Sequence, residues 1–155
     1  MLVLGAKLPK ESVMRMIFVN LPVKDVQASR RFFGALGFTF NKQFSDNTAA
    51  AMVIEKNIVA MLLEKPRFQD FIKTEISDAS KTKEVLTCVS ANSRAEVKEI
   101  YAKAIAAGGR SWLPPQDHAF MYEVSFLDPD DHVWEIVWMD PIAMRSTELV
   151  SAEAA

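Results

Sequence analysis

Short apolar runs alternate with turn-forming residues in the first half of the chain. Two of these runs are partly β-branched and end in proline or charged residues, which is typical of strands. Between the first two runs, Asp25 offers a helix N-cap, and apolar positions recur at helical spacing from Val26 to Leu36. Gly37 occupies the position of a helix-ending glycine. The predicted strands are residues 14–21, 38–44, 48–54 and 58–63.

The same order of patterns returns in the second half. Ser93 and Glu96 have the capping-box spacing, and an apolar helical face runs from Val97 to Ile105. Gly108 and Gly109 are expected to end this helix. Asp128 begins a turn of the sequence Asp-Pro-Asp-Asp. The predicted strands are residues 84–90, 110–113, 120–127 and 133–139.

Each half therefore predicts a strand–helix–strand–strand–strand module. A repeated unit that cannot cover its own sheet face is expected to pack against its copy. The sequence thus predicts an α+β fold in which two βαβββ modules form a curled mixed sheet around a cavity. The expected boundaries are an N-terminal arm at 1–12, a first module at 13–65, a linker with a short helix at 66–81, a second module at 82–140 and a C-terminal tail at 141–155.

Composition narrows the classes of function. The 155 residues carry a formal net charge of −2, so no basic surface for nucleic acid is expected. The single cysteine, Cys88, excludes an intramolecular disulfide and a Cys-x-x-Cys metal pair. Charged residues interrupt every long apolar stretch, so no membrane span is expected, and the N-terminus does not resemble a signal peptide. These features indicate a cytoplasmic soluble protein.

Three motifs carry a resemblance to a known family. They are Leu21-Pro-Val-Lys-Asp-Val26, the later Phe32-Phe33 followed by Leu36-Gly37-Phe38, and Asp128-Pro-Asp-Asp-His132-Val-Trp-Glu135. With the duplicated module, they resemble the vicinal oxygen chelate superfamily, which contains glyoxalases, bleomycin- and fosfomycin-resistance proteins and extradiol dioxygenases. Gln116-Asp-His118 and Trp134-Glu-Ile-Val-Trp-Met-Asp140 are similar to the branch labelled predicted lactoylglutathione lyase.

The resemblance implies four metal-binding positions, one on each of four strands. Matched onto this sequence, they fall on Phe18, Met61, Glu84 and Glu135. Phenylalanine has no ligand atom, and a methionine thioether suits Cu(I) better than divalent metals. Catalytic zinc sites usually have three protein ligands. We therefore expect a degenerate metal site, with either no cofactor or a weakly held divalent metal (Zn, Ni, Mn or Fe) on Glu84 and Glu135.

Strand alternation predicts which side chains face the cavity. If Glu135 points inward, Trp134, Ile136 and Trp138 face the helix layer. The apolar face of residues 122, 124 and 126 is expected to meet the helix as well, which leaves the alternate positions for the cavity. The predicted pocket-lining residues are Phe18, Asn20, Met61, Leu63, Glu123 and Ser125.

The candidate catalytic residues are Glu135, Glu84 and His118, and each has a structural alternative. Glu135 is either a metal ligand or general base, or a paired glutamate retained with the fold. Glu84 and Glu123 are either functional or solvated charges. His118 is either a base or substrate clamp at the cavity mouth, or a surface histidine. His132 is interpreted as a structural turn residue, and Cys88 as an inert core residue.

Two functions follow. The first is a glyoxalase-family protein that binds a small molecule in a pocket, with a degenerate metal site. The alternative is a metal-dependent lyase or isomerase of the lactoylglutathione lyase type, acting on a small oxygenated substrate, in which Asp117 or His118 could complete the site. The resemblance also implies a homodimer, with Trp134, Trp138 and residues 66–71 as candidate contacts.

Overall fold

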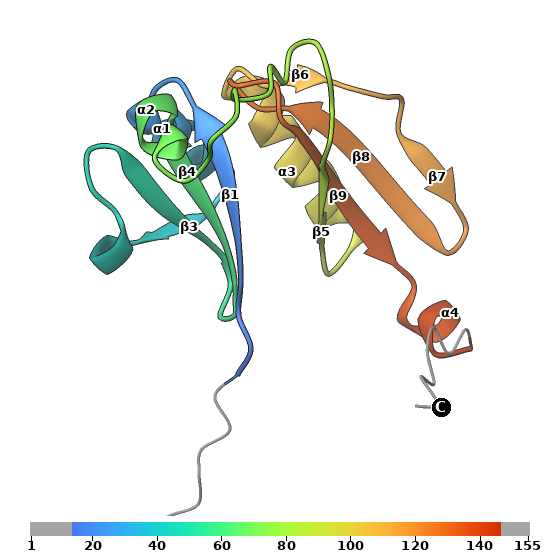
Figure 1. Cartoon of the computed structure of the whole chain (residues 1–155). Coiled ribbons are helices and arrows are strands. Elements are labelled where there is room, and N and C mark those ends of the chain that lie inside the picture. The colour runs from blue at the N-terminus through green and yellow to red at the C-terminus, as the bar shows by residue number, and fades with distance from the viewer. Residues whose placement is uncertain (1–13, 147–155) are drawn as a thin grey trace, which may run out of the picture.

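The computed structural model describes residues 14–146. The first module contains a four-stranded sheet of order β1-β4-β3-β2, in which β1 pairs in parallel with β4 and the other pairs are antiparallel (Figure 1). Helix α1 follows β1 and packs on this sheet. The elements are β1 (Ile17–Val23), α1 (Val26–Ala35), β2 (Thr39–Asn41), the 3₁₀ turn η1 (Lys42–Phe44), β3 (Ala49–Glu55) and β4 (Ile58–Glu64).

The second module repeats this plan with one additional strand. Its main path has the order β5-β9-β8-β6, β5 pairs in parallel with β9, and the short β7 also pairs with β8. The elements are β5 (Leu86–Ser90), α3 (Arg94–Ala106), β6 (Arg110–Ser111), β7 (Gln116–His118), β8 (Met121–Leu127) and β9 (Val133–Met139). Helix α2 (Lys65–Gln69) begins the linker, and α4 (Pro141–Ser146) follows β9. The predicted pair of βαβββ modules is confirmed, as two sheets.

Both main helices begin at the residues that the sequence indicated. Asp25 Oδ1 accepts hydrogen bonds from the backbone N–H groups of Gln27 (2.8 Å) and Ala28 (3.1 Å). Ser93 Oγ accepts one from the N–H of Glu96 at 3.1 Å. These side chains satisfy donors that the first helical turn leaves free.

One hydrophobic core joins the two modules. Phe33 of α1 packs edge-on against Trp134 of β9, with ring centroids 5.0 Å apart, and Phe32 lies 6.2 Å from Phe126 of β8. Trp134 is 0% exposed. The helix-facing pattern predicted for β8 and β9 is therefore confirmed, but the expectation that Trp134 contacts another copy is wrong, because this side chain is already buried within one chain.

Gly109 lies in a tightly packed region just after α3, within contact distance of both modules. A Cβ at this position would lie 2.8 Å from the carbonyl oxygen of Ala104 and 3.1 Å from both the Leu127 carbonyl oxygen and Cε2 of Phe32. Two of these three neighbours are backbone atoms, which move only with their elements. The glycine is thus required for space at the end of α3.

Several predicted boundaries shift. Pro22 lies inside β1 rather than ending it, because β1 is an edge strand and can lack a donor there. The predicted strand at 84–90 begins only at Leu86, and residues 42–44 form a 3₁₀ turn. The expected arm at 1–12 and most of the C-terminal tail lie outside the described residues, although the tail begins with α4. Among the helices described, none is long and apolar enough to cross a bilayer.

Candidate functional site

Three acidic groups meet on the face of the second sheet that points away from α3. Cys88 of β5 lies directly opposite Glu135 of β9 in the parallel register. Glu135 in turn lies opposite Ser125 of β8, two residues beyond Glu123. The ligand atoms of Cys88, Glu123 and Glu135 all lie within 4.8 Å of one another. Alternation along three neighbouring strands therefore builds a cluster that no sequence spacing displays.

Burial and neighbouring carboxylates raise the pKa values of two of these groups, Cys88 and Glu123. Burial, and then the charges of Glu123 and Glu135, raise the pKa of the Cys88 thiol to about 11. Burial, followed by the charge of Glu135, raises the pKa of Glu123 above its usual range. Both causes disfavour the charged forms. Cys88 is therefore a thiol rather than a reactive thiolate at neutral pH.

The sequence expectation for Cys88 was wrong in one respect. The residue is exposed on the open face of the edge strand β5 rather than packed in the core. Strand parity did place it on the same face as Glu135. What the sequence could not show is that β5 is an outer strand whose open face is not covered by a helix.

The structure does not bring Glu84 to Glu135. Leu86 is the first residue of β5 and pairs with Val133, so Glu84 lies before the strand begins. Four residues of extended chain span roughly 13 Å, which separates Glu84 from the level of Cys88. The expected metal pair of Glu84 and Glu135 is therefore replaced by Cys88, Glu123 and Glu135. Glu84 instead lines a different cavity, together with His132.

His118 and Asp117 are engaged elsewhere. Both belong to β7, which was predicted as a loop. The Asp117 carboxylate accepts a hydrogen bond from Nη1 of Arg94 at 2.6 Å, and Arg94 also donates to the His118 carbonyl oxygen. The ring of His118 stacks on Phe120, 5.8 Å away. Neither residue belongs to the Cys88–Glu123–Glu135 cluster.

Ser125 has a structural partner. It is buried, and its Oγ accepts a hydrogen bond from the backbone N–H of Leu113 at 3.1 Å. The segment after β6 thus covers the position that was predicted to line the cavity. This contact leaves Glu123 and Glu135, but not Ser125, on the open part of the sheet face.

The corresponding face of the first sheet has its own cavity, of about 400 Å³. Asn20, Met61 and Leu63, all predicted to line a pocket, lie in its wall. Arg67 and Asp46 contribute charge, and Phe44 and Phe71 contribute exposed rings. Phe18 lies on the same strand face but does not line this cavity; its side chain is 51% exposed.

An apolar groove of about 530 Å³ separates the outer strands of the two sheets. Alternate residues of β1 (Ile17, Val19 and Leu21) form one wall, and all five residues of β5 form the other. The structure thus divides the single predicted cavity into separate hollows.

Comparisons with protein families and with solved structures show which known fold the chain resembles. Residues 15–54 match the family described as bleomycin resistance protein-like N-terminal. No curated protein sequence matches the chain. Among solved structures, a hypothetical protein from S. aureus is 24% identical, with 81% of this chain and 94% of that chain covered and a TM-score of 0.69.

Two further solved structures come from proteins whose family or role is named. A glyoxalase/bleomycin resistance protein/dioxygenase family enzyme from Burkholderia phytofirmans is 17% identical, covers 81% of this chain and 99% of its own, and gives a TM-score of 0.67. The fosfomycin resistance protein FosX from Listeria monocytogenes is 14% identical, with coverages of 84% and 97% and a TM-score of 0.59. The chain has the glyoxalase/bleomycin resistance/dioxygenase fold, which supports the superfamily resemblance.

Proposed function

We propose that this protein binds a small molecule on the open faces of its sheets and that the four-position metal site of the resembling family is degenerate in it. The observation that carries this proposal is the cavity walled by Asn20, Met61 and Leu63. Met61, one of the four positions that the resemblance assigns to metal ligands, lies in its wall and offers only a soft thioether. Phe18, another of these positions, lies outside the cavity and offers no ligand atom. Half of the cavity's lining residues are polar or charged, so a small molecule bound there would make polar as well as apolar contacts.

The finer form of the proposal includes a homodimer. The open faces of both sheets carry exposed apolar side chains, including Phe18 and Leu86. A second copy is a suitable cover for such faces, since contiguous exposed apolar surface is unfavourable in water. The Pro66–Phe71 segment and Trp138 remain the contact residues we propose.

The Cys88–Glu123–Glu135 cluster supports a second candidate, a metal-dependent lyase or isomerase. Thiolate and carboxylate groups are suitable ligands for Zn²⁺, and three protein ligands are the usual number at a catalytic zinc. A divalent cation would replace the mutual repulsion of these groups with attraction. Bound there, the metal would supply Lewis-acid chemistry. Glu123 and Glu135 are the carboxylates positioned to hold or move a proton beside it.

Calorimetric titration of the metal-free protein separates the two candidates. Zn²⁺, Ni²⁺, Mn²⁺ and Fe²⁺ would be added to the wild type, to Glu135→Gln and to the matched control Glu84→Gln. The degenerate-site proposal expects weak binding with affinities in all three proteins within about threefold. Tight binding of one metal per chain, lost in Glu135→Gln and kept in Glu84→Gln, would contradict it and favour the metalloenzyme.

A further inference from the structure

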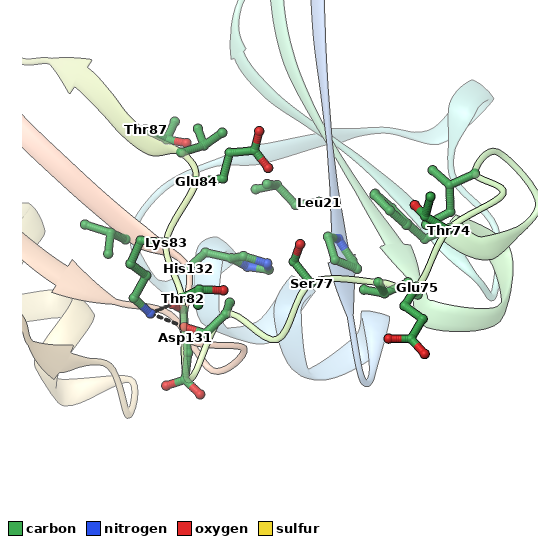
Figure 2. Close-up of a pocket in the computed structure, with 17 residues that line it drawn as sticks. Leu21, Thr74, Glu75, Ser77, Thr82, Lys83, Glu84, Thr87, Asp131 and His132 are labelled. Atoms are coloured by element: carbon green, nitrogen blue, oxygen red, sulfur yellow. Dashed lines mark hydrogen bonds between the residues drawn. The ribbon is translucent and has the colours of Figure 1, made fainter.

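A separate cavity of about 280 Å³ lies under the linker between the two modules. The linker segment 72–85 forms much of its wall, and Leu21 of β1 and Val133 of β9 lie in the remainder (Figure 2). This volume is just below the roughly 300–1,000 Å³ of typical ligand pockets. It is large enough for a single-ring compound.

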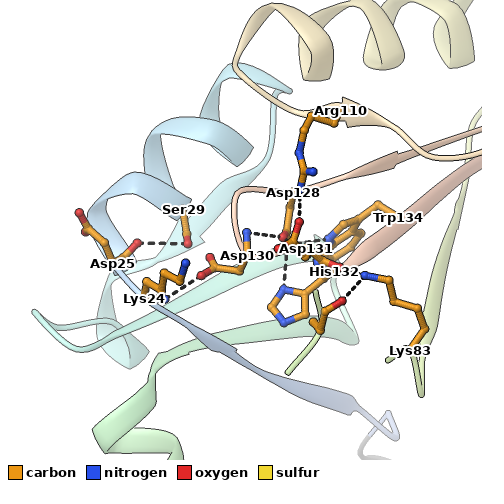
Figure 3. Close-up of polar contacts among 11 residues, drawn as sticks. Lys24, Asp25, Ser29, Lys83, Arg110, Asp128, Asp130, Asp131, His132 and Trp134 are labelled. Carbon is orange, nitrogen blue, oxygen red and sulfur yellow. Dashed lines mark hydrogen bonds and ion pairs between the residues drawn. The ribbon is translucent and has the colours of Figure 1, made fainter. Parts of the chain in front are cut away.

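The buried carboxylate of Asp128 holds the imidazole of His132, one of the residues that line this cavity. Asp128 is 2% exposed and accepts four hydrogen bonds (Figure 3). Its Oδ1 accepts from the backbone N–H groups of Asp130 (2.8 Å) and His132 (3.0 Å), and its Oδ2 is 3.1 Å from Nε1 of Trp134 and 2.9 Å from Nδ1 of His132. An ionised carboxylate only accepts hydrogen bonds, so Nδ1 of His132 carries a proton and donates it.

In the neutral imidazole, this contact leaves the other ring nitrogen of His132, Nε2, as an acceptor. The His132 side chain is 12% exposed, and its ring projects into the cavity between Leu21 and Ser77 (Figure 2). Among the described residues none forms a hydrogen bond with Nε2. A histidine whose Nδ1–H is fixed by a carboxylate has a defined orientation and tautomer.

The turn that carries His132 is fixed from both sides. Asp131 adopts a left-handed conformation, with φ of 68°. Its carboxylate pairs with Arg110, and its carbonyl oxygen accepts a hydrogen bond from Nζ of Lys83 at 2.6 Å. Lys83 also donates to the Ala79 carbonyl oxygen, so the linker is tied to the turn. The cavity is therefore bounded by a linked set of contacts.

The charges around the cavity indicate the charge of the ligand that it can bind. Lys83 is the only cation among the lining residues, and its ammonium group is occupied by two carbonyl oxygens. Glu75 and Glu84 make the surroundings acidic, which opposes an anion, whereas the Asp131 carboxylate is already paired with Arg110. A cation would lose hydration against the apolar wall of Leu21, Phe68 and Ile72, which is costly. A neutral molecule with one hydrogen-bond donor avoids both the repulsion of an anion and the dehydration of a cation.

We propose that Asp128 and His132 form the polar end of a second binding site, in which Nε2 of His132 accepts a hydrogen bond from the hydroxyl group of a small, mainly apolar molecule such as a phenol. The site lies apart from the Cys88–Glu123–Glu135 cluster and from the Asn20–Met61–Leu63 cavity. It does not depend on the function proposed for either of them.

An NMR titration with 4-methylphenol tests the proposal, with 4-methylanisole as the matched ligand that lacks the donor. The readouts are the backbone amides of residues 74–85 and the imidazole nitrogens of His132. Three variants complete the design: His132→Phe, the control His118→Phe, whose ring lies outside the cavity, and Ile72→Trp, which fills the cavity and leaves the Asp128–His132 pair intact.

We expect 4-methylphenol to shift these amides and the Nε2 resonance. We expect it to bind about fivefold or more tightly than the ether, consistent with one hydrogen bond. Binding should weaken about as much in His132→Phe, disappear in Ile72→Trp and persist in His118→Phe. Equal affinity for the two ligands, unchanged binding in His132→Phe or Ile72→Trp, shifts confined to other surfaces, or no saturable shifts up to the solubility limit would each overturn the proposal.

Discussion

Cys88 and Glu135 lie directly opposite each other on adjacent parallel strands, on the sheet face that none of the described helices covers. Glu123 reaches the same point from the next strand. Three groups that lose protons on ionisation therefore share one small region. Together with burial, this relationship raises the pKa values of the Cys88 thiol and of Glu123, and both effects can be measured without knowing the ligand.

The reactivity of Cys88 is the first consequence. Its thiol pKa is raised from the ordinary 9.0 to about 11, so its thiolate fraction near pH 8 should be about a hundredfold below that of an ordinary thiol. We expect slow alkylation by iodoacetamide, with a rate that keeps rising to high pH. Because Cys88 is the only cysteine, the measured rate belongs to it alone.

Glu135→Gln should accelerate this alkylation, because the substitution removes a negative charge that disfavours the thiolate. Glu84→Gln, outside the cluster, is the control and should leave the rate unchanged. A thiol that titrates near its ordinary value in the wild type would refute the proposed electrostatic coupling.

The pH dependence of stability provides a second prediction. Burial and the Glu135 charge raise the pKa of Glu123 in the folded state. The folded chain therefore binds the proton more tightly than the unfolded chain, and stability falls as pH rises above 4.5 through the folded pKa. Above this window the penalty is fully present. Glu123→Gln should thus raise the melting temperature at pH 7, and the gain should shrink toward zero below pH 4.5.

Glu99 is the matched comparison, with the opposite sign. The hydrogen bond and charge of Lys103 lower the pKa of Glu99, so the charged form is favoured by folding. Glu99→Gln should lower the melting temperature slightly at pH 7. A decrease for Glu123→Gln at pH 7 would contradict the repulsion inferred for the cluster.

Substitution of Gly109 tests the tight packing at the end of α3. Gly109→Ala places a Cβ 2.8 Å from the carbonyl oxygen of Ala104, and relieving this overlap requires movement of the backbone. We expect a loss of about 1–3 kcal/mol in the free energy of unfolding, measured in urea. Gly34→Ala is the control, because nothing lies within 4 Å of its Cβ and it belongs to α1. It should stabilise the protein by about 0.5–1 kcal/mol.

Substitution of Asp128 tests the buried hydrogen bonds at the turn before β9. Asp128→Asn turns an amide N–H₂ group toward at least one of the four donors that the carboxylate accepts from. We expect a loss of about 2–4 kcal/mol in the free energy of unfolding, followed by Trp fluorescence in urea. Asp78→Asn is the control, since that exposed carboxylate bonds only to nearby Ser80 and Lys81. Equal losses for the two variants would exclude a special role for Asp128.

Much of the fold could be predicted from local patterns. Capping by Asp25 and Ser93 depends on side chains a few residues from the donors they satisfy, so the helix starts were visible in the sequence. Strand alternation identified the helix-facing sides of β8 and β9, because the apolar side chains on one face of a strand are buried whichever element packs against them. The lyase branch of the resemblance and the roles of the site residues stay predictions.

Register and connectivity could not be read in this way. Matching to the family pattern placed Glu84 beside Glu135, whereas pairing between β5 and β9 puts Cys88 there. The local sequence pattern does not reveal the register between two strands, because hydrogen bonds between strands are made by backbone atoms common to every residue. His132 was likewise interpreted as a turn residue, since its cavity is built by a linker about fifty residues earlier in the chain.

The sequence by itself determined the two modules, their helix caps and the apolar faces, because each depends on neighbours within one element. Only the tertiary structure decided which polar side chains meet. It joined Cys88 to Glu123 and Glu135, tied Asp117 to Arg94, and enclosed His132 beneath the linker. These contacts depend on strand order and on the packing of one module against the other. Both involve residues far apart in the chain, so no local sequence pattern reveals them.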